Sequence, residues 1–368
     1  MKLNKKILIV TPTFLPAYHV GGPIFQIIKL IDNLKNKNIE HKVITTNRSL
    51  DKSKNKYKNV IYLKSFLGRL YFSPTLIFFL IKKIIKYDNI YIVSCFNFFS
   101  LFSAIICIIF SKNYFLSPRG SLMYESVNLK NKSMKKLWIL IFEKIIINNA
   151  KKVIFSSEYE KKETLKIIKL NNYSIIHNFQ TMNVKNLRNL KKKNENYLLY
   201  LGRITKKKNI DKLILAYDTK NNFKIKIIGN GEHEYIKYIN ELILKKNLSN
   251  KIKILRPVYN EKKKINLFLK ARFSILISET ENFGNTILES IICKTPVIIS
   301  KKTAFSNLIY KKRLGVTCAN TDEDLKNIFN KINLGFNVKI NDVKQKEILE
   351  KFDDDRLIKK YLSLFNIT

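Results

Sequence analysis

Two glutamates and two cations in the second half of the chain are spaced for binding a charged, hydroxyl-rich ligand. Glu281 and Glu289 flank a Phe-Gly-Asn turn that directly follows an apolar run, and Arg203 and Lys208 follow an earlier apolar run. Arginine offers a planar fork of donors and lysine a mobile point charge, a combination that suits a diphosphate. Carboxylates accept hydrogen bonds from pairs of sugar hydroxyls. Either glutamate alone could cap a helix or join a surface pair; the four residues together favour a binding site.

Glycines stand next to these side chains. Gly202 directly precedes Arg203, and Gly229 and Gly231 follow the next apolar run, where a backbone without side chains can approach a ligand closely. Gly-x-Gly also marks ordinary tight turns, so this pair alone is a weak signal. The turn between the glutamates should begin a helix whose free N–H groups can bind phosphate oxygens. It consists of Phe283, Gly284 and Asn285.

Apolar runs of strand length alternate with helix-period stretches along the chain. In the first such stretch Ile24, Ile27 and Ile31 share one face after Pro23, a residue common at helix starts. This alternation predicts the α/β fold class, with parallel sheets covered by helices and ligands bound at the carboxyl ends of the strands. The predicted strands are residues 6–10, 41–45, 59–63, 89–94, 113–117, 151–156, 173–177, 197–202, 223–229, 251–255, 273–278 and 296–300.

The length of 368 residues favours two domains. Residues 183–196 form a polar, basic stretch without apolar period, which makes them the best boundary. We therefore expect two Rossmann-like, doubly wound parallel-sheet domains over residues 1–182 and 197–350, joined by the linker 183–196.

The charge balance suggests an anionic partner. The chain has 69 Lys and Arg against 28 Asp and Glu, a formal net charge of +41, which raises nucleic acid or an anionic membrane surface as partners. A biased composition would equally place such residues on solvated faces of both halves. A nucleic-acid binder would need basic residues interleaved with stacking aromatics, or a recognisable module. We find neither, so we expect no nucleic-acid partner.

The cysteines and the N-terminus favour a cytoplasmic location. The cysteines form neither a C-x-x-C pair nor a regular framework, which predicts buried thiols in a reducing compartment. The apolar run at residues 7–10 is too short for a signal peptide. Residues 89–111 carry no charge and could span a bilayer, but the β-rich start and the polar Asn97 favour a buried strand followed by a buried helix.

The second half resembles the retaining glycosyltransferases of family 4, which have the GT-B fold. Residues 202–214, GRITKKKNIDKLI, resemble the family's Gly-Arg-x4-Lys motif, and Glu281 with Glu289 its Glu-x7-Glu motif. Residues 12–26 resemble more weakly its first loop with paired glycines. The SPRGSLMYES segment resembles a Pro-Arg-Gly segment of some members. The last helix, in 351–368, resembles one that crosses back onto the first domain.

The resemblance implies transfer of a sugar from a nucleotide diphosphate donor, with retained anomeric configuration and no metal or other cofactor. Arg203 and Lys208 would neutralise the departing diphosphate, Glu281 would hold the donor sugar and Glu289 the ribose. A donor phosphate oxygen would take the acceptor proton. The other donor-binding positions would be Gly21, Gly22, Gly202, Gly229, Phe283, Gly284 and Asn285. His19 and Arg119 are candidates for acceptor or phosphate contacts, against an ordinary loop histidine and a surface arginine.

Several positions depart from the family pattern. Asn209 and Phe179 stand where glycine is common, Lys294 interrupts a usual Cys-Gly-Thr-Pro, and Arg256 begins a loop that often has glycine. These departures leave the base and sugar of the donor open.

The acceptor is expected to be a saccharide, lipid-linked, in the synthesis of a bacterial surface polysaccharide such as O-antigen, capsule or exopolysaccharide. Residues 66–86 and 128–147 mix apolar and aromatic residues with Lys and Arg. Such mixtures can seat a protein peripherally on the cytoplasmic face of the inner membrane. They are equally typical of core helices with basic outer faces. The alternatives are another GT-B enzyme, such as a nucleotide-sugar epimerase, and a non-enzymatic basic binding protein.

Overall fold

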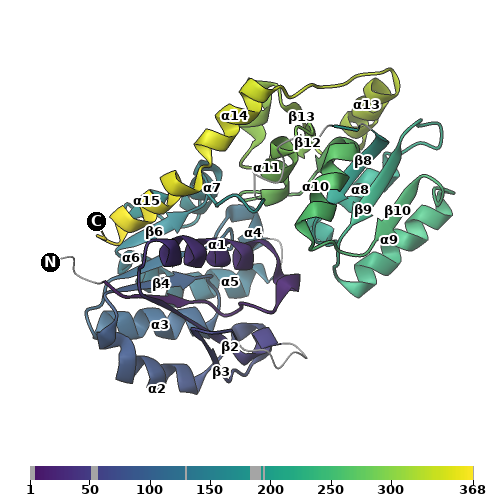
Figure 1. Cartoon of the computed structure of the whole chain (residues 1–368). Helices are drawn as coiled ribbons and strands as arrows, with labels where there is room; N and C mark the ends of the chain where they lie inside the picture. Colours follow the sequence, from purple (N-terminus) through teal and green to yellow (C-terminus); the bar gives the residue numbers. More distant parts are fainter. Residues whose placement is uncertain (1–4, 51–56, 129–130, 183–191, 194, 368) are drawn as a thin grey trace. The chain divides into compact units, whose positions relative to one another are not determined.

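The computed structural model describes residues 5–50, 57–128, 131–182, 192–193 and 195–367, except for the side chains of His19 and Ser49. The chain forms two compact units (Figure 1). The first consists of Met1–Phe179 together with Asp354–Thr368, and the second of Gln180–Asp353. Most of the linker expected at 183–196 lies outside the described residues.

The first unit is built on a seven-stranded sheet in the order β3-β2-β1-β4-β5-β6-β7, with every pair parallel. Its central strands β1, β4 and β5 are buried along their whole length, because helices cover both faces. The strands are β1 (Ile7–Val10), β2 (His41–Thr46), β3 (Val60–Leu63), β4 (Asn89–Val93), β5 (Tyr114–Ser117), β6 (Lys152–Phe155) and β7 (Tyr173–Ile175).

Alternate residues of these strands face two different helix layers. Leu8 and Val10 pack with α2 (Pro74–Lys83), α3 (Phe98–Ile109), the π-helical turn η5 (Ile139–Glu143) and α6 (Lys144–Asn148). Ile7 and Ile9 pack with α1 (Gly22–Asn36) and with α15 (Asp354–Leu364), which lies beside α1 in Figure 1. The remaining helices are η1 (Tyr18–Val20), η2 (Asn47–Leu50), η3 (Gly68–Leu70), η4 (Ile84–Lys86), α4 (Tyr124–Asn128), α5 (Lys132–Trp138) and α7 (Glu158–Leu165).

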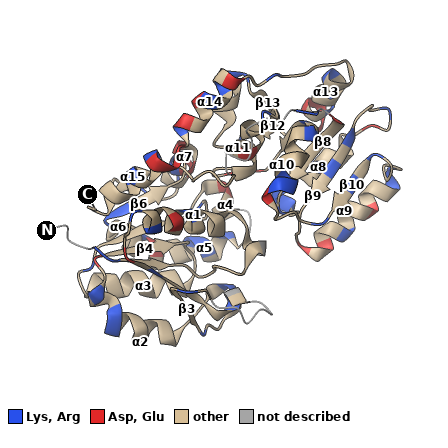
Figure 2. Cartoon of the chain, viewed as in Figure 1, with Lys and Arg blue, Asp and Glu red and all other residues tan. Residues whose placement is uncertain are grey.

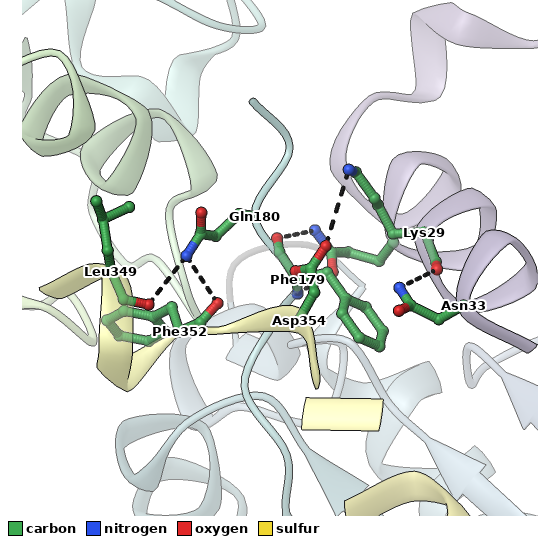
Figure 3. Close-up of polar contacts among 8 residues, drawn as sticks. Lys29, Asn33, Phe179, Gln180, Leu349, Phe352 and Asp354 are labelled. Carbon is green, nitrogen blue, oxygen red and sulfur yellow. Dashed lines mark hydrogen bonds and ion pairs between the residues drawn. The ribbon is translucent and has the colours of Figure 1, made fainter. Parts of the chain in front are cut away.

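Where the chain passes from one unit to the other, hydrogen bonds and one ion pair, each made within a single unit, hold the residues on either side of the crossing (Figure 3). In the first unit, the N–H of Phe179 donates to Gln26 Oε1 (2.7 Å), and Lys29 Nζ lies 3.9 Å from Asp354 Oδ2. In the second, Gln180 Nε2 donates to the carbonyls of Leu349 (3.1 Å) and Phe352 (2.9 Å). Both crossings of the chain are therefore anchored by hydrogen bonds or ion pairs within a unit.

The second unit has a six-stranded sheet in the order β10-β9-β8-β11-β12-β13, again parallel throughout. Its strands are β8 (Glu195–Leu201), β9 (Lys224–Ile228), β10 (Ile252–Leu255), β11 (Ala271–Leu276), β12 (Val297–Ser300) and β13 (Gly315–Cys318). Its helices are η7 (Lys206–Lys208), α8 (Ile210–Leu215), α9 (His233–Lys245), α10 (Glu261–Lys270), α11 (Asn285–Ile292), α12 (Ser306–Lys312), α13 (Asp322–Asn333) and α14 (Asp342–Lys351).

The expected fold class, two Rossmann-like parallel α/β domains, is confirmed, and every predicted strand is present. The edge strand β13 was not among them. The uncharged stretch 89–111 forms the buried strand β4 and the helix α3, as predicted. Among the described residues no helix is long and apolar enough to cross a membrane. The four cysteines are buried, and burial raises the pKa of the thiols, to about 12 for Cys107 and Cys293.

Candidate active site

The order of strands in the second unit brings two loops to one edge of its sheet. The chain runs from β8 outward through β9 and β10, then returns to β11 on the other side of β8. Open α/β sheets bind ligands where the strand order reverses in this way. Two hydrogen bonds join the loops after β8 and β11: the N–H of Glu279 donates to the Lys207 carbonyl (2.8 Å), and Asn209 Nδ2 donates to the Ile277 carbonyl (2.9 Å).

Lys208 and Glu281 form an ion pair across this reversal point. Lys208 Nζ donates to Glu281 Oε2, and each side chain is 15% exposed. Burial alone would raise the pKa of the Glu281 carboxyl, but Lys208, and more weakly the other cations of its loop, outweigh burial and hold that pKa below its ordinary value. The backbone of Glu281 is fixed as well, because its N–H donates to the Lys302 carbonyl (3.0 Å) and its carbonyl accepts from the N–H of Ala304 (3.2 Å).

Arg203 differs from Lys208 although both lie in the loop after β8. Its side chain is exposed, and within the described residues its guanidinium forms neither a hydrogen bond nor an ion pair. Its backbone is fixed by a hydrogen bond, since the hydroxyl of the buried Tyr200 donates to the Arg203 carbonyl (2.6 Å). The loop therefore presents a cation with five free donors on a fixed backbone.

Gly229 and Gly231 have no side chains and so let the loop after β9 pack closely against the loop after β8. A Cβ on Gly229 would lie 1.8 Å from the Gly202 carbonyl oxygen, and a Cβ on Gly231 would lie 1.8 Å from the Ile204 carbonyl oxygen. Hydrogen bonds join the same segments, from the N–H of Gly202 to the Ile228 carbonyl (3.0 Å) among others. The close backbone approach that the sequence suggested is therefore made between two loops of the protein. Contact of either glycine with a donor stays a prediction.

The turn between the two glutamates begins α11. Gly284 has φ +78°, a conformation that favours glycine, and a Cβ there would lie 2.8 Å from Ile287 Cδ1, the end of a side chain that would have to move. Asn285 is the first residue of α11, and the N–H of Ile287 in the same turn donates to the Gly284 carbonyl (2.9 Å). The Phe283 ring is buried against Phe305 and Phe352, with centroids 5.0 Å and 5.7 Å away. The Phe283 side chain therefore belongs to the core, and contact of this residue with a donor stays a prediction.

Glu289 lies in a buried cluster whose members differ from those of the Lys208–Glu281 pair. Its side chain is 3% exposed, and its Oε1 accepts hydrogen bonds from Lys264 Nζ of α10 and from Thr181 Oγ1. Its Oε2 is buried and has no partner within the described residues. Neither Lys264 nor Thr181 was predicted from the sequence. No local pattern marks them, because both are far from Glu289 in the sequence and reach it only in the folded chain, Lys264 from α10 and Thr181 from the segment after β7.

Two departures from the family pattern have a backbone explanation. Asn209 has φ +53° and Lys294 has φ +54°, the left-handed region in which glycine is the common choice. Asparagine tolerates this conformation, while the lysine must bear its strain. Phe179, by contrast, is a buried side chain that stacks on Tyr361 at 5.7 Å between ring centroids.

The remaining predicted site residues lie in the first unit. Gly21 has φ +83° in the loop after β1, and a Cβ there would meet nothing within 4 Å, so its conformation alone favours glycine. Gly22 begins α1. The side chain of His19 lies outside the described residues. Arg119 is half-buried and donates to Asn178 Oδ1 (2.7 Å) and to the Tyr91 hydroxyl (2.9 Å), so it is no free surface arginine. Its contact with an acceptor or phosphate stays a prediction.

Comparisons with known proteins find similar sequences and similar folds. Residues 184–334, which lie within the second unit, match the family model "Glycosyl transferases group 1". The chain is 27% identical, over 330 residues and 87% of each sequence, to an uncharacterized glycosyltransferase of Methanocaldococcus jannaschii. Its fold is similar to a sucrose-phosphate synthase from Thermosynechococcus elongatus (TM-score 0.76, 16% identity, 98% of each chain). It is also similar to HepE from Anabaena in complex with UDP and glucose (TM-score 0.73, 18% identity, 99% of this chain and 100% of that one). The chain thus has the GT-B fold of glycosyltransferases, and its second unit carries the segment that the group 1 glycosyl transferase model describes.

Proposed function

We propose that this chain is a retaining, family 4-type glycosyltransferase that moves a sugar from a nucleotide diphosphate donor to a saccharide acceptor. The observation that carries the proposal is the exposed Arg203 beside the Lys208–Glu281 pair, at the strand-order reversal of the unit that matches the family model. The bound UDP and glucose of Anabaena HepE make a UDP-sugar the first donor to test.

The proposed chemistry uses the two cations to stabilise the leaving group. As the bond from the sugar C1 to the diphosphate breaks, negative charge grows on the phosphate oxygen, and Arg203 and Lys208 would stabilise it. One such fixed donor contributes roughly 3 kcal/mol to the transition state. Glu281 orients Lys208 and would accept from donor-sugar hydroxyls, while Glu289 would accept from the ribose. The acceptor oxygen bonds to C1 on the face that the diphosphate leaves, and its proton passes to the departing phosphate oxygen.

We further propose that no metal ion is required, because cationic side chains would perform the electrostatic work that a metal ion performs in other transferases. Initial rates after dialysis against EDTA test this directly. We expect undiminished rates. Activity that is lost and then restored only by a divalent cation would contradict this part of the proposal.

The first unit supports a lipid-linked acceptor and a peripheral membrane location. The neighbouring helices α2, α3 and α6, with α5, η4 and η5, expose large apolar side chains over a surface called here the apolar-basic face. These side chains are Phe78, Ile81, Ile85, Ile109, Met134, Leu137, Leu140, Ile141 and Ile145. Exposed lysines accompany them, and the only acid on these elements is the buried Glu143. Lys and Arg also occur widely elsewhere on both units (Figure 2).

An anionic bilayer is the partner that such a face fits. Apolar side chains can enter the headgroup region, while lysines bind lipid phosphates. We therefore propose attachment to the cytoplasmic face of the inner membrane and a lipid-linked saccharide acceptor, in the synthesis of a bacterial surface polysaccharide.

The test of transfer is release of nucleoside diphosphate from the donor. We expect release that depends on added acceptor. Conversion of the donor sugar into an isomer without acceptor would instead favour a nucleotide-sugar epimerase. Absence of any reaction or nucleotide binding would favour a non-enzymatic protein.

A further inference from the structure

The buried cluster around Glu289 has an uneven arrangement of donors. Both donors, Lys264 Nζ and Thr181 Oγ1, bind the same oxygen, Oε1. The other oxygen, Oε2, is buried and unpartnered within the described residues. An unpaired buried acceptor costs roughly 1–3 kcal/mol, and native proteins rarely leave one without a partner.

The charge of Glu289 is already balanced within this cluster. The ammonium of Lys264 forms an ion pair with Oε1 and compensates the carboxylate charge directly. The missing partner of Oε2 is therefore a neutral donor, such as a hydroxyl group, and a second cation is not needed.

The backbone that carries Lys264 is anchored at the start of α10. Lys264 lies in the first turn of α10, whose start is capped by Asn260 Oδ1 accepting from the N–H of Lys263 (3.0 Å). The next residue, Ile265, is buried in a small core that also contains Cys293, the residue after α11. Helix α10 and the C-terminal cap of α11 thus pack in the same core.

We infer that Lys264, assisted by Thr181, is a positioning residue that holds Oε1 of Glu289 and so turns its free oxygen, Oε2, towards a ribose hydroxyl of the nucleotide. The inference rests on the proposed function, in which Glu289 binds the ribose, and adds the residues that make this contact selective for ribonucleotides. A deoxyribose would leave Oε2 unpaired. Wild-type protein should therefore bind a ribonucleoside diphosphate at least tenfold more tightly than its 2′-deoxy or its 3′-deoxy counterpart.

Calorimetric titration with UDP, ADP and GDP and with their 2′- and 3′-deoxy forms tests the inference. Lys264→Met should weaken binding of the ribonucleotide at least tenfold and leave binding of the weaker-binding deoxy form nearly unchanged. The preference for the ribonucleotide over the deoxy form would then be lost. Lys264→Arg should restore part of it. Thr181→Val, which creates no unpaired charge, should reduce it several-fold. Lys262→Met changes an exposed lysine of the same helix turn and should match wild type.

The outcomes distinguish failure of the role of Lys264 from failure of the proposed function. Thermal unfolding first checks that Lys264→Met and Thr181→Val are folded. If wild type binds a ribonucleotide and both variants keep the wild-type ratio of ribo to deoxy affinity, the role of Lys264 is overturned. The proposed function stands in that case. If none of the three diphosphates binds wild type, the proposed function fails and this inference fails with it.

Discussion

Arg203 and Lys208 lie in one loop but in different electrostatic settings. Lys208 forms an ion pair with Glu281. The Arg203 guanidinium is exposed and has no hydrogen bond or ion pair with the residues that the structure describes. Removing Arg203 therefore deletes a cation without disturbing the folded protein. Removing Lys208 leaves a buried carboxylate unpaired, which typically costs about 3–5 kcal/mol. Loss of activity in a Lys208 variant would mix the two effects.

Arg203→Ala is for this reason the cleaner test of leaving-group stabilisation. We expect kcat to fall about a hundredfold, because one fixed donor is worth roughly 3 kcal/mol in the transition state. The midpoint of urea unfolding should not change. Lys206→Ala, an exposed cation of the same loop, serves as the control and should keep both rate and stability. A near-normal rate in Arg203→Ala would remove this residue from the chemistry.

The Glu281 carboxyl should make stability depend on pH in the acid range. Its pKa in the folded protein is lowered, so the folded state binds fewer protons there than the unfolded state. Its contribution is complete above the unfolded pKa, about 4.3, and is lost as the pH falls through the folded value. The difference in unfolding free energy between wild type and Glu281→Gln should therefore shrink below about pH 4. A difference that stays constant from pH 7 to pH 3 would mean that the ion pair is not formed in solution.

At the scale of elements, strand positions could be read from the sequence because parallel strands buried on both faces are continuous apolar runs. The missed strand, β13, is four residues long and begins with Gly315, where a Cβ would lie 1.9 Å from the Val297 carbonyl oxygen. Close packing selects glycine there and removes the apolar signal. The Lys208–Glu281 pair joins predicted residues, whereas Lys264 and Thr181 could not be predicted, because the tertiary fold alone brings these distant residues to Glu289.

Gly229 tests how tightly the loops after β8 and β9 must pack. Gly229→Ala places a methyl group against the Gly202 carbonyl, so the loop that carries Arg203 must shift. We expect a loss of stability of about 1–3 kcal/mol, as for other overpacked sites, together with weaker nucleotide binding. Asn230→Ala changes a neighbouring side chain without this clash and should be nearly neutral. Wild-type stability and affinity in Gly229→Ala, measured by urea unfolding and calorimetry, would show that the loops need not touch.

At the scale of the whole molecule, a net charge of +41 has two possible meanings, a general bias of composition or a specific surface for anions. The apolar-basic face separates them, because its lysines accompany exposed apolar side chains on helices whose only acid is buried. Compositional bias alone would predict no difference between this face and a basic surface elsewhere.

Liposome flotation decides between these meanings. Each basic residue near an anionic surface contributes about 1 kcal/mol, so we expect binding to anionic vesicles at low salt and little to neutral ones. Charge reversal at Lys82 and Lys83 of α2 and at Lys86 of η4 should abolish it. The same change at Lys237, Lys245 and Lys253 of the second unit removes equal charge and should have little effect. Equal loss in both triple variants would assign the binding to general charge, and no binding at all would reject attachment.

The most direct test of the central claim is the structure of the product. Purified protein is incubated with isotopically labelled nucleotide diphosphate sugars and a membrane lipid extract as acceptor, and the product is isolated for NMR. We predict label in a new glycosidic bond whose anomeric configuration is that of the donor, formed about a hundredfold more slowly by Arg203→Ala. A product of inverted configuration, or label recovered only as an isomer of the nucleotide sugar, would contradict the account.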